Sequence, residues 1–121
     1  MKIIIKTKNL ESSISLDSFV EKKYGALQKF IDILKYEDEG KTLAEVNVEV
    51  EKDSGHHRKG DIYLVKAQVV LPGRSIVAQA QEEDLFVAVV KARDELKMEI
   101  EKYKLKKIDK NRRQARKLKA E

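Results

Sequence analysis

The residue types that most often carry catalysis or bind metals are scarce in this chain, whereas basic residues are abundant. Its 121 residues include no cysteine and two histidines, and the histidines, His56 and His57, are adjacent. Two neighbouring histidines without a cysteine or a third histidine make a poor set of metal ligands. The carboxylates are spread along the charged faces of predicted helices and strands, and no phosphate-binding glycine loop is present. The sequence therefore predicts no metal, no cofactor and no enzymatic activity.

Positive charge is concentrated at the carboxyl end of the chain. In total, 26 Lys and Arg residues oppose 21 Asp and Glu residues, which gives a net charge of +5. Residues 102–121 (KYKLKKIDKNRRQARKLKAE) hold ten basic and two acidic residues, so this segment carries +8. Residues 1–101 hold 16 basic and 19 acidic residues and carry −3. This asymmetry is typical of a protein that binds a polyanion, either nucleic acid or an anionic membrane.

Nucleic acid is the better of these two partners. A helix that lies on a membrane needs a broad apolar face, but residues 106–119 offer only Ile108, Ala115 and Leu118. The apolar run near the amino end is three isoleucines long, too short for a signal peptide or a membrane span. The sequence predicts a cytoplasmic protein that does not bind membranes.

The elements that must position the basic residues follow from hydropathy patterns in the order β-α-β-β-β-α. Apolar residues that alternate with polar ones, or form short β-branched runs, predict strands at 2–8, 45–52, 62–71 and 74–80. Apolar residues at spacings of three, four and seven predict helices over 14–36 and from about 83 to 107. Ser13 or Ser15 offers an N-cap for the first helix. Residues 53–61 are predicted to form a hairpin loop, and Pro72-Gly73 a tight turn.

The predicted fold is α+β, a four-stranded sheet with two helices packed on one face. After the first strand, its element order matches that of double-stranded-RNA-binding domains. We expect one domain over residues 1–107, followed by a basic, flexible tail over residues 108–121. Few residues are aromatic, and no exposed Phe or Tyr cluster suggests a base-stacking platform, so recognition of structured RNA by shape and phosphates is favoured.

Two helix faces are candidate contacts for a phosphate backbone. At 100° per residue, Lys22 and Lys29 share a stripe of the first helix, and Arg93, Lys97 and Lys104 share one on the second. Each residue taken singly has the plainer interpretation of an ordinary solvated helix face, and the tail could serve solubility alone. If the helices lie side by side, however, their basic stripes form one ribbon that continues into the tail.

A more specific resemblance follows from the order of features. The stretch HHRKGDIYLVKAQVVLPGRSIVAQAQEEDLFVAVVKARDEL, followed by Lys102-x-Lys104-x-Lys106, is similar to the ribosome hibernation-promoting factor and ribosome-associated inhibitor family over roughly residues 1–107. This resemblance implies a factor that binds the small ribosomal subunit between head and body. There it would exclude mRNA and tRNA and hold the ribosome inactive. The family's rRNA-facing basic residues correspond here to Lys23, Lys29, Lys102, Lys104 and Lys106.

The complete predicted set of rRNA-binding residues combines this correspondence with helix phase and the start of the basic tail. It comprises Lys22, Lys23, Lys29, Arg93, Lys97, Lys102, Lys104, Lys106 and Lys107. We expect a monomer whose partners are the small ribosomal subunit and its rRNA, and which competes with mRNA and tRNA. The alternative is a free-standing module that binds structured or double-stranded RNA away from the ribosome. The chain differs from inhibitor-type members of the family in its tail, which is basic where theirs is acidic.

Overall fold

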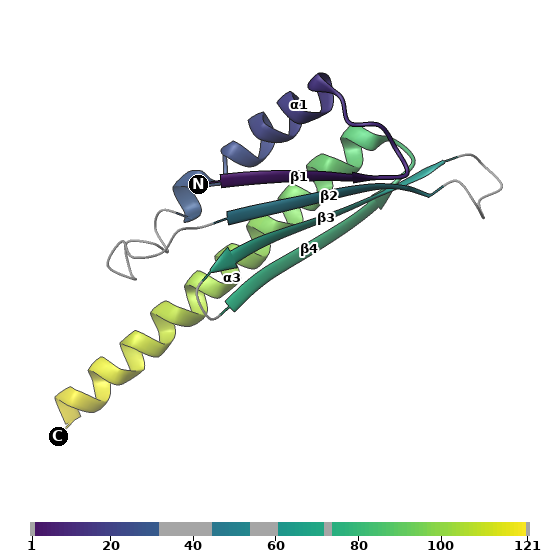
Figure 1. The fold of residues 1–121 in the computed structure, drawn as a ribbon. Coiled ribbons are helices and arrows are strands. Elements are labelled where there is room, and N and C mark those ends of the chain that lie inside the picture. The colour runs from purple at the N-terminus through teal and green to yellow at the C-terminus, as the bar shows by residue number, and fades with distance from the viewer. Residues whose placement is uncertain (1, 32–44, 54–60, 72–73, 121) are drawn as a thin grey trace.

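The protein folds as a four-stranded sheet with its helices packed on one face (Figure 1). The structure, a computed structural model, describes residues 2–31, 45–53, 61–71 and 74–120. The strands are β1 (Lys2–Lys8), β2 (Glu45–Asp53), β3 (Ile62–Leu71) and β4 (Arg74–Glu82), and the long helices are α1 (Ile14–Gly25) and α3 (Leu85–Ala120). The predicted element order and the α+β class are confirmed. Of the predicted hairpin loop at residues 53–61, Asp53 instead ends β2. Residues 54–60, which include both histidines, and the predicted turn at Pro72-Gly73 lie outside the described residues.

The sheet is mixed, and its strands lie in the order β1-β2-β3-β4. β1 pairs parallel to β2, with Ile5 opposite Val48, because α1 carries the chain back before β2 begins. The other neighbours are antiparallel, and Val48 in turn lies opposite Ala67. Alternation places Val46, Val48 and Val50 on the helix-facing side, where all three are buried.

The core lies between this face of the sheet and the apolar stripes of the helices. Leu16, Val20 and Tyr24 of α1 are buried there, as are Val89 and Leu96 of α3. Full burial of a side chain of this size contributes about 1.5–3 kcal/mol relative to exposure. The predicted stripes are therefore the parts of the helices that hold the fold together.

Both helices begin at side-chain caps. The Ser13 hydroxyl accepts a hydrogen bond from the Leu16 amide at 3.0 Å, so Ser13 is the N-cap of α1. Asp84 plays the corresponding role before α3, because one of its carboxylate oxygens accepts from the amides of Phe86 and Val87 at 2.8 and 3.1 Å. These bonds satisfy amide groups that have no partner within the helix.

The first helical segment is interrupted where the sequence predicts continuity. α1 ends at Gly25, a turn occupies residues 26–27, and residues 28–31 are helical again. The Leu27 carbonyl accepts from the amides of Phe30 and Ile31, so a new helical turn starts at Leu27. Glycine lowers helix propensity by about 1 kcal/mol relative to alanine. Leu27 and Ile31 are nevertheless buried, so the restarted turn still packs against the core.

The second helix is longer than predicted, since α3 continues to Ala120 rather than ending near Lys107. Residues 105–120 contain no glycine or proline and are rich in Lys, Arg, Gln, Ala and Leu. These residue types favour helix even where no apolar stripe requires one. Figure 1 shows this part of α3 extending past the end of the sheet. The division of the chain at residue 107 and the flexibility of residues 108–121 stay predictions.

Candidate nucleic-acid interface

α1 and the first half of α3 lie side by side and run in the same direction. The rings of Phe19 and Phe86 meet edge to face, with their centroids 4.8 Å apart. Further along, the Tyr24 hydroxyl donates a hydrogen bond to the Val89 carbonyl at 3.0 Å. At the far end, the Lys97 ammonium lies 5.0 Å from the centre of the Phe30 ring. These contacts fix the relative position of the two helices and of the basic residues they carry.

Three of the predicted basic residues meet around a shallow hollow where the chain of α1 restarts. Lys29, Arg93 and Lys97, here termed the α1–α3 cluster, line this hollow together with Phe30 and Asp94. The Lys29 ammonium lies 5.3 Å from the Phe30 ring centre, so one aromatic ring holds two ammonium groups. Attraction between a cation and an aromatic face is effective within about 6 Å. The cluster can therefore present three positive charges to one anion.

Arg93 has a carboxylate partner inside this cluster. Its guanidinium donates to one oxygen of Asp94 from Nε at 3.0 Å and from Nη2 at 2.7 Å. The Arg93 side chain is only 23% exposed, which limits how far it can move, whereas that of Asp94 is 56% exposed. Asp94 thus orients the guanidinium but also places a negative charge among the three cations of the cluster.

The charges of Arg93 and Asp94 both influence the pKa of the buried Tyr24 hydroxyl. Burial raises the pKa of the Tyr24 hydroxyl well above its usual range, while Arg93 lowers this pKa and Asp94 raises it by smaller amounts. The hydroxyl therefore stays protonated at physiological pH and can donate to the Val89 carbonyl. Its function is to join the helices rather than to transfer protons.

Two further predicted residues lie earlier on α1. The Lys23 ammonium lies 5.6 Å from the centre of the Phe19 ring, which itself packs on Phe86. Lys22 is exposed. Lys23 therefore belongs to the surface where the helices meet, whereas Lys22 is a solvated residue on α1.

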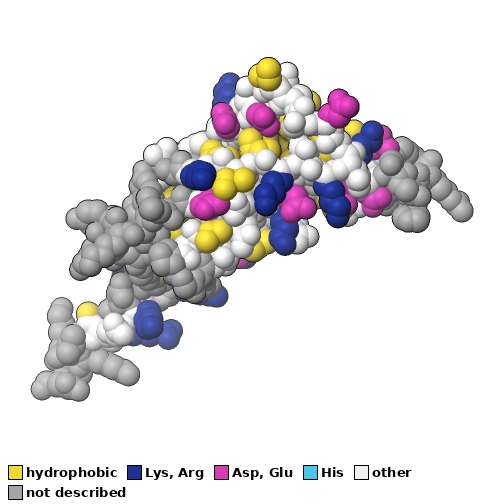
Figure 2. All heavy atoms as spheres, in the orientation of Figure 1, with side chains coloured by type: hydrophobic (Ala, Val, Ile, Leu, Met, Phe, Trp, Pro, Cys, Tyr) yellow, Lys and Arg dark blue, Asp and Glu magenta, His cyan; other side chains and the backbone are white. Residues whose placement is uncertain are grey.

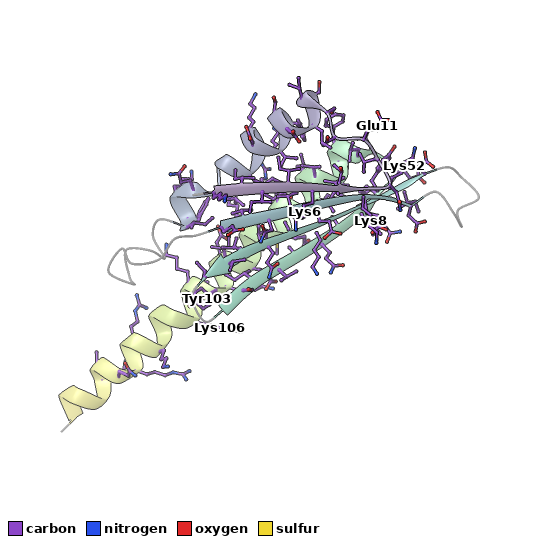
Figure 3. All side chains as sticks on the ribbon, in the orientation of Figure 1. Lys6, Lys8, Glu11, Lys52, Tyr103 and Lys106 are labelled. Carbon is purple, nitrogen blue, oxygen red and sulfur yellow. The ribbon has the colours of Figure 1, made fainter. Side chains whose placement is uncertain are left out.

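Lys102 and Lys106 lie on the other flank of α3, beside the edge strand β4. They line a second hollow with Tyr103, Glu99 and residues 75–77 of β4, and Lys102 pairs with Glu99 at 3.2 Å. We term Lys102 and Lys106 the β4-side pair, and Figure 3 labels Tyr103 and Lys106 where α3 passes the end of the sheet. Lys102 follows Arg93 by nine residues, or about two and a half turns of helix, so the two side chains leave α3 on opposite sides.

The expected basic ribbon therefore does not take in Lys102 and Lys106. Lys104 follows Arg93 by eleven residues, about three full turns, so it continues the stripe of the α1–α3 cluster. Lys102 and Lys106 face away from that stripe because residues two apart on a helix point in different directions. The side chain of Lys107 lies outside the described residues. The structure thus presents basic groups on two flanks of α3 rather than along one line.

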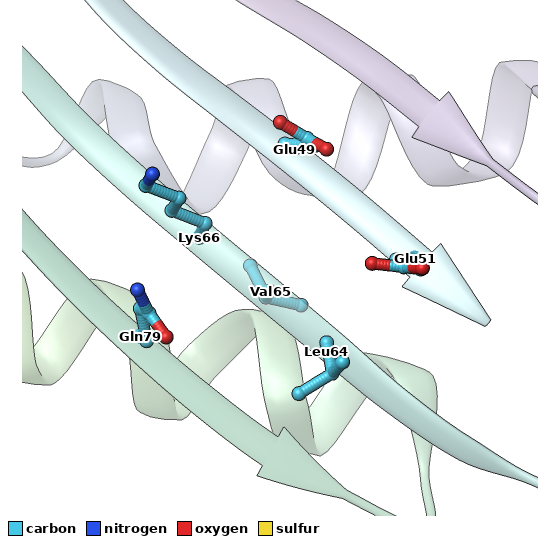
Figure 4. A pocket seen from close by; sticks show the side chains of 6 residues that line it. All are labelled: Glu49, Glu51, Leu64, Val65, Lys66 and Gln79. Atoms are coloured by element: carbon cyan, nitrogen blue, oxygen red, sulfur yellow. The ribbon is translucent and has the colours of Figure 1, made fainter. Parts of the chain in front are cut away.

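The opposite face of the sheet has a mixed charge pattern. Figure 2 looks onto this face and shows Lys and Arg interspersed with Asp and Glu. Lys6 and Lys66 both lie opposite Glu49 in the strand register, and Lys8 pairs with Glu51 at 3.8 Å. Figure 4 shows a shallow depression here between Glu49, Lys66 and Gln79. Charges that cancel in this way make a poor polyanion surface.

Sequence reasoning did not identify the aromatic residues that position the cations. Phe19 and Phe30 fall within the predicted helix over 14–36, where the sequence assigns them no role in binding, yet their rings lie under Lys23, Lys29 and Lys97. The spacing of Phe19 and Lys23, four residues on one helix, is a signal that could have identified one such pair. The contact between Phe30 and Lys97 joins segments far apart in sequence and had no local signal.

Within the described ranges, His, Cys, Asp and Glu side chains form no group of three that could hold a metal ion. In this same part of the chain, no helix is both long enough and apolar enough to span a membrane. His56 and His57, which the sequence indicates to be a poor set of metal ligands, lie outside these ranges.

Comparison with known proteins identifies the class to which this fold and its basic helices belong. The family model described as sigma 54 modulation protein / S30EA ribosomal protein matches residues 3–108. Because this match spans most of the chain, the protein belongs to this family, that of the ribosome hibernation-promoting factors, and the resemblance predicted from its sequence is confirmed. The match ends before most of the projecting part of α3.

Individual relatives agree with this assignment. The chain is 25% identical over 113 residues to the ribosome hibernation promoting factor of Acinetobacter guillouiae, covering 90% of this chain and 92% of the relative. Its fold is similar to that of a ribosomal subunit interface protein from Coxiella burnetii, with TM-score 0.66, 24% identity and coverage of 87% and 99% of the two chains. It is also similar to the N-terminal domain of Protein Y from Thermus thermophilus, with TM-score 0.63, 22% identity and coverage of 85% and 99%.

Proposed function

We propose that this protein binds the rRNA of the small ribosomal subunit in the channel used by mRNA and tRNA, and that it silences the ribosome by occupying that channel. Family membership supports a role in ribosome hibernation, and the relative from Acinetobacter guillouiae carries that function in its name. The mechanism is steric and involves no catalytic step. The protein acts in the cytoplasm as a monomer and leaves when mRNA and tRNA compete successfully.

The observation that carries this proposal is the convergence of Lys29, Arg93 and Lys97 from two helices around Phe30. Folded RNA presents closely spaced phosphates, and most contacts that position a protein on nucleic acid go to the phosphates and sugars. A cluster held by helix packing loses less side-chain freedom on binding than three independent lysines would lose. Lys23 and Lys104 extend the same surface at its two ends, while Lys102, Lys106 and the residues beyond Lys107 add contacts of their own.

The first experiment measures binding to purified small subunits by cosedimentation over a range of salt concentrations. If about six Lys and Arg residues engage phosphates, the log-log slope of affinity against salt should be roughly −4. Added mRNA and tRNA should displace the protein from the subunit. Binding that ignores salt or survives saturating mRNA and tRNA would contradict the proposal.

A matched pair of variants tests whether the α1–α3 cluster is responsible. The triple variant Lys29→Gln, Arg93→Gln, Lys97→Gln removes three charges from the cluster, and Lys6→Gln, Lys8→Gln, Lys66→Gln removes three from the opposite face of the sheet. The first should reduce the steepness of the salt slope by about 2, using roughly 0.7 per phosphate contact. The second should leave the slope nearly unchanged. Equal effects of the two triple variants on the slope would mean that only net charge matters. Tight binding of the wild type to isolated RNA hairpins would instead favour a free-standing RNA-binding module.

A further inference from the structure

The last part of α3, residues 104–120, is here termed the arm. Among the described side chains of α3, Ile100 is the last that is fully buried, and Tyr103 packs half-buried against the core. The described side chains after Lys104 are all exposed, and Leu105 is 62% exposed. Figure 1 shows the arm extending away from the sheet, and Figure 2 shows Lys and Arg side chains on its described part. The described part of the protein therefore contributes little that would cover the arm.

The basic residues of the arm are distributed around its whole circumference. Lys106 and Lys110 form one stripe and Arg112 and Arg116 another, each pair being spaced four residues apart. At 100° per residue these two stripes are turned by about 120° from each other, and Lys104 lies about 100° from the second stripe and about 140° from the first. Within the described side chains, no wide flank of the arm is free of positive charge.

This distribution differs from that of the preceding part of α3. There Arg93 and Lys97 occupy one flank, and the buried face and acidic residues such as Asp94 separate them from Lys102. The arm has nine Lys and Arg residues and a single acidic residue in its sequence. A helix that rested on a flat RNA surface would use cations on one side only. Like charges four residues apart repel each other, so every unmatched stripe weakens the free helix.

Phosphates on several sides of the arm would counter this repulsion everywhere. An α-helix with side chains is about 10–12 Å across, and the arm is about 25 Å long. Folded RNA offers such surroundings in a widened groove or at a junction between helices, where two phosphate backbones face each other. A lipid surface fits poorly, because the exposed Leu105 lies at the same angle as the stripe of Arg112 and Arg116, and the described side chains of the arm form no broad apolar face.

We propose that the arm inserts between two phosphate backbones of folded RNA, which contact it from at least two of its three basic flanks. The proposal rests on the proposed function in so far as that function supplies an RNA partner. It goes further in giving the arm an enclosed site of its own, most of which lies beyond residue 108, where the match to the family model ends. The arm thereby acts as a second, separate anchor beside the α1–α3 cluster.

The test compares single stripes in the full-length protein. The variants are Lys106→Gln with Lys110→Gln, and Arg112→Gln with Arg116→Gln; Lys6→Gln with Lys66→Gln is the control. Glutamine keeps helix propensity close to that of lysine and arginine. In an enclosed arm, both stripe variants should weaken binding to small subunits, and each should reduce the salt slope by about 1.4. If either stripe variant matches the control, the arm lies on a one-sided surface and the proposal is overturned.

A protection experiment distinguishes this proposal from the proposed function. Trypsin cleaves after Lys and Arg, so an enclosed arm should be protected at both stripes when the full-length protein is bound. If the protein fails to bind small subunits but binds another folded RNA, the stripe variants and trypsin are applied to that RNA. Comparable effects of both stripes there would sustain the arm proposal while the proposed function fails. Retention on polyglutamate but on no RNA would overturn RNA as the occupant.

Discussion

The Tyr24 hydroxyl donates a hydrogen bond to the main-chain carbonyl of Val89 at 3.0 Å, and this buried bond joins α1 to α3. It lies between the ring contact of Phe19 with Phe86 and the contact of Phe30 with Lys97. The two helices are thus held at three successive levels. The basic cluster at the last level depends on this alignment, because it draws residues from both segments.

Replacement of Tyr24 by Phe should remove the bond while keeping the ring. A hydrogen bond of this kind contributes about 0.5–1.5 kcal/mol, so the free energy of unfolding should fall by about that amount. Denaturation with urea, followed by circular dichroism, measures the change. The variant Tyr63→Phe, on the half-buried β3, serves as a control for loss of a tyrosine hydroxyl. An unchanged stability in Tyr24→Phe would mean that the bond adds nothing to the packing of the rings.

The same residue should limit stability at high pH. Because burial raises the pKa of Tyr24 in the folded state above its unfolded value of about 10, unfolded chains lose this proton first. The stabilisation is complete below pH ~10 and declines as the pH rises further. Stability measured between pH 8 and 11 should therefore fall more steeply in the wild type than in Tyr24→Phe. Parallel curves for the two proteins would contradict this origin.

The fold followed from the sequence wherever burial imposes a period. Val46, Val48 and Val50 alternate with polar residues, and only one orientation of the strand buries all three. The end of α3 could not be predicted in this way. The apolar stripe stops near Tyr103, whereas residues that favour helix continue to Ala120. An apolar period reports where a helix meets the core rather than where the helix ends.

The site was predicted in part for a similar reason. Helix phase grouped Arg93 with Lys97, and the structure adds Lys29 to them across the helix contact. The resemblance to the family placed the closely spaced Lys102, Lys104 and Lys106 in one group. Helical geometry instead directs Lys104 to one flank and the other two toward β4. Distance along the chain is a poor guide to which charges share a surface.

Phe30 should matter for RNA binding although it carries no charge. Its ring lies under both Lys29 and Lys97, and each such contact contributes about 0.5–1 kcal/mol at an exposed site. Leucine at this position keeps an apolar side chain but removes the aromatic face. Phe30→Leu should lower affinity for small subunits by roughly two- to fivefold, or ~0.4–1 kcal/mol. Cosedimentation measures this effect.

A matched variant of Phe30→Leu is Phe19→Leu, because among the described residues the Phe19 ring contacts one ammonium group, that of Lys23. It should weaken binding less than Phe30→Leu does. Thermal denaturation of both variants shows whether a loss of binding reflects a loss of folding. An equal effect of the two substitutions on affinity would indicate that general packing of the helices, rather than the orientation of the cluster, governs binding.

Asp94 should restrain RNA binding, since its carboxylate lies within the basic cluster and pairs with Arg93. Asp94→Asn removes the repulsion of a phosphate and should raise affinity at low salt by about two- to fivefold, equivalent to ~0.4–1 kcal/mol. Glu99 pairs with Lys102 on the other flank of α3. The corresponding variant, Glu99→Gln, tests whether the β4 side also contacts RNA. Glu51→Gln, on the far face of the sheet, is the control for net charge. Small-subunit binding at several salt concentrations should show a gain for Asp94→Asn that fades as salt rises. A gain of equal size in Glu51→Gln would assign the effect to overall charge and remove Asp94 from the interface.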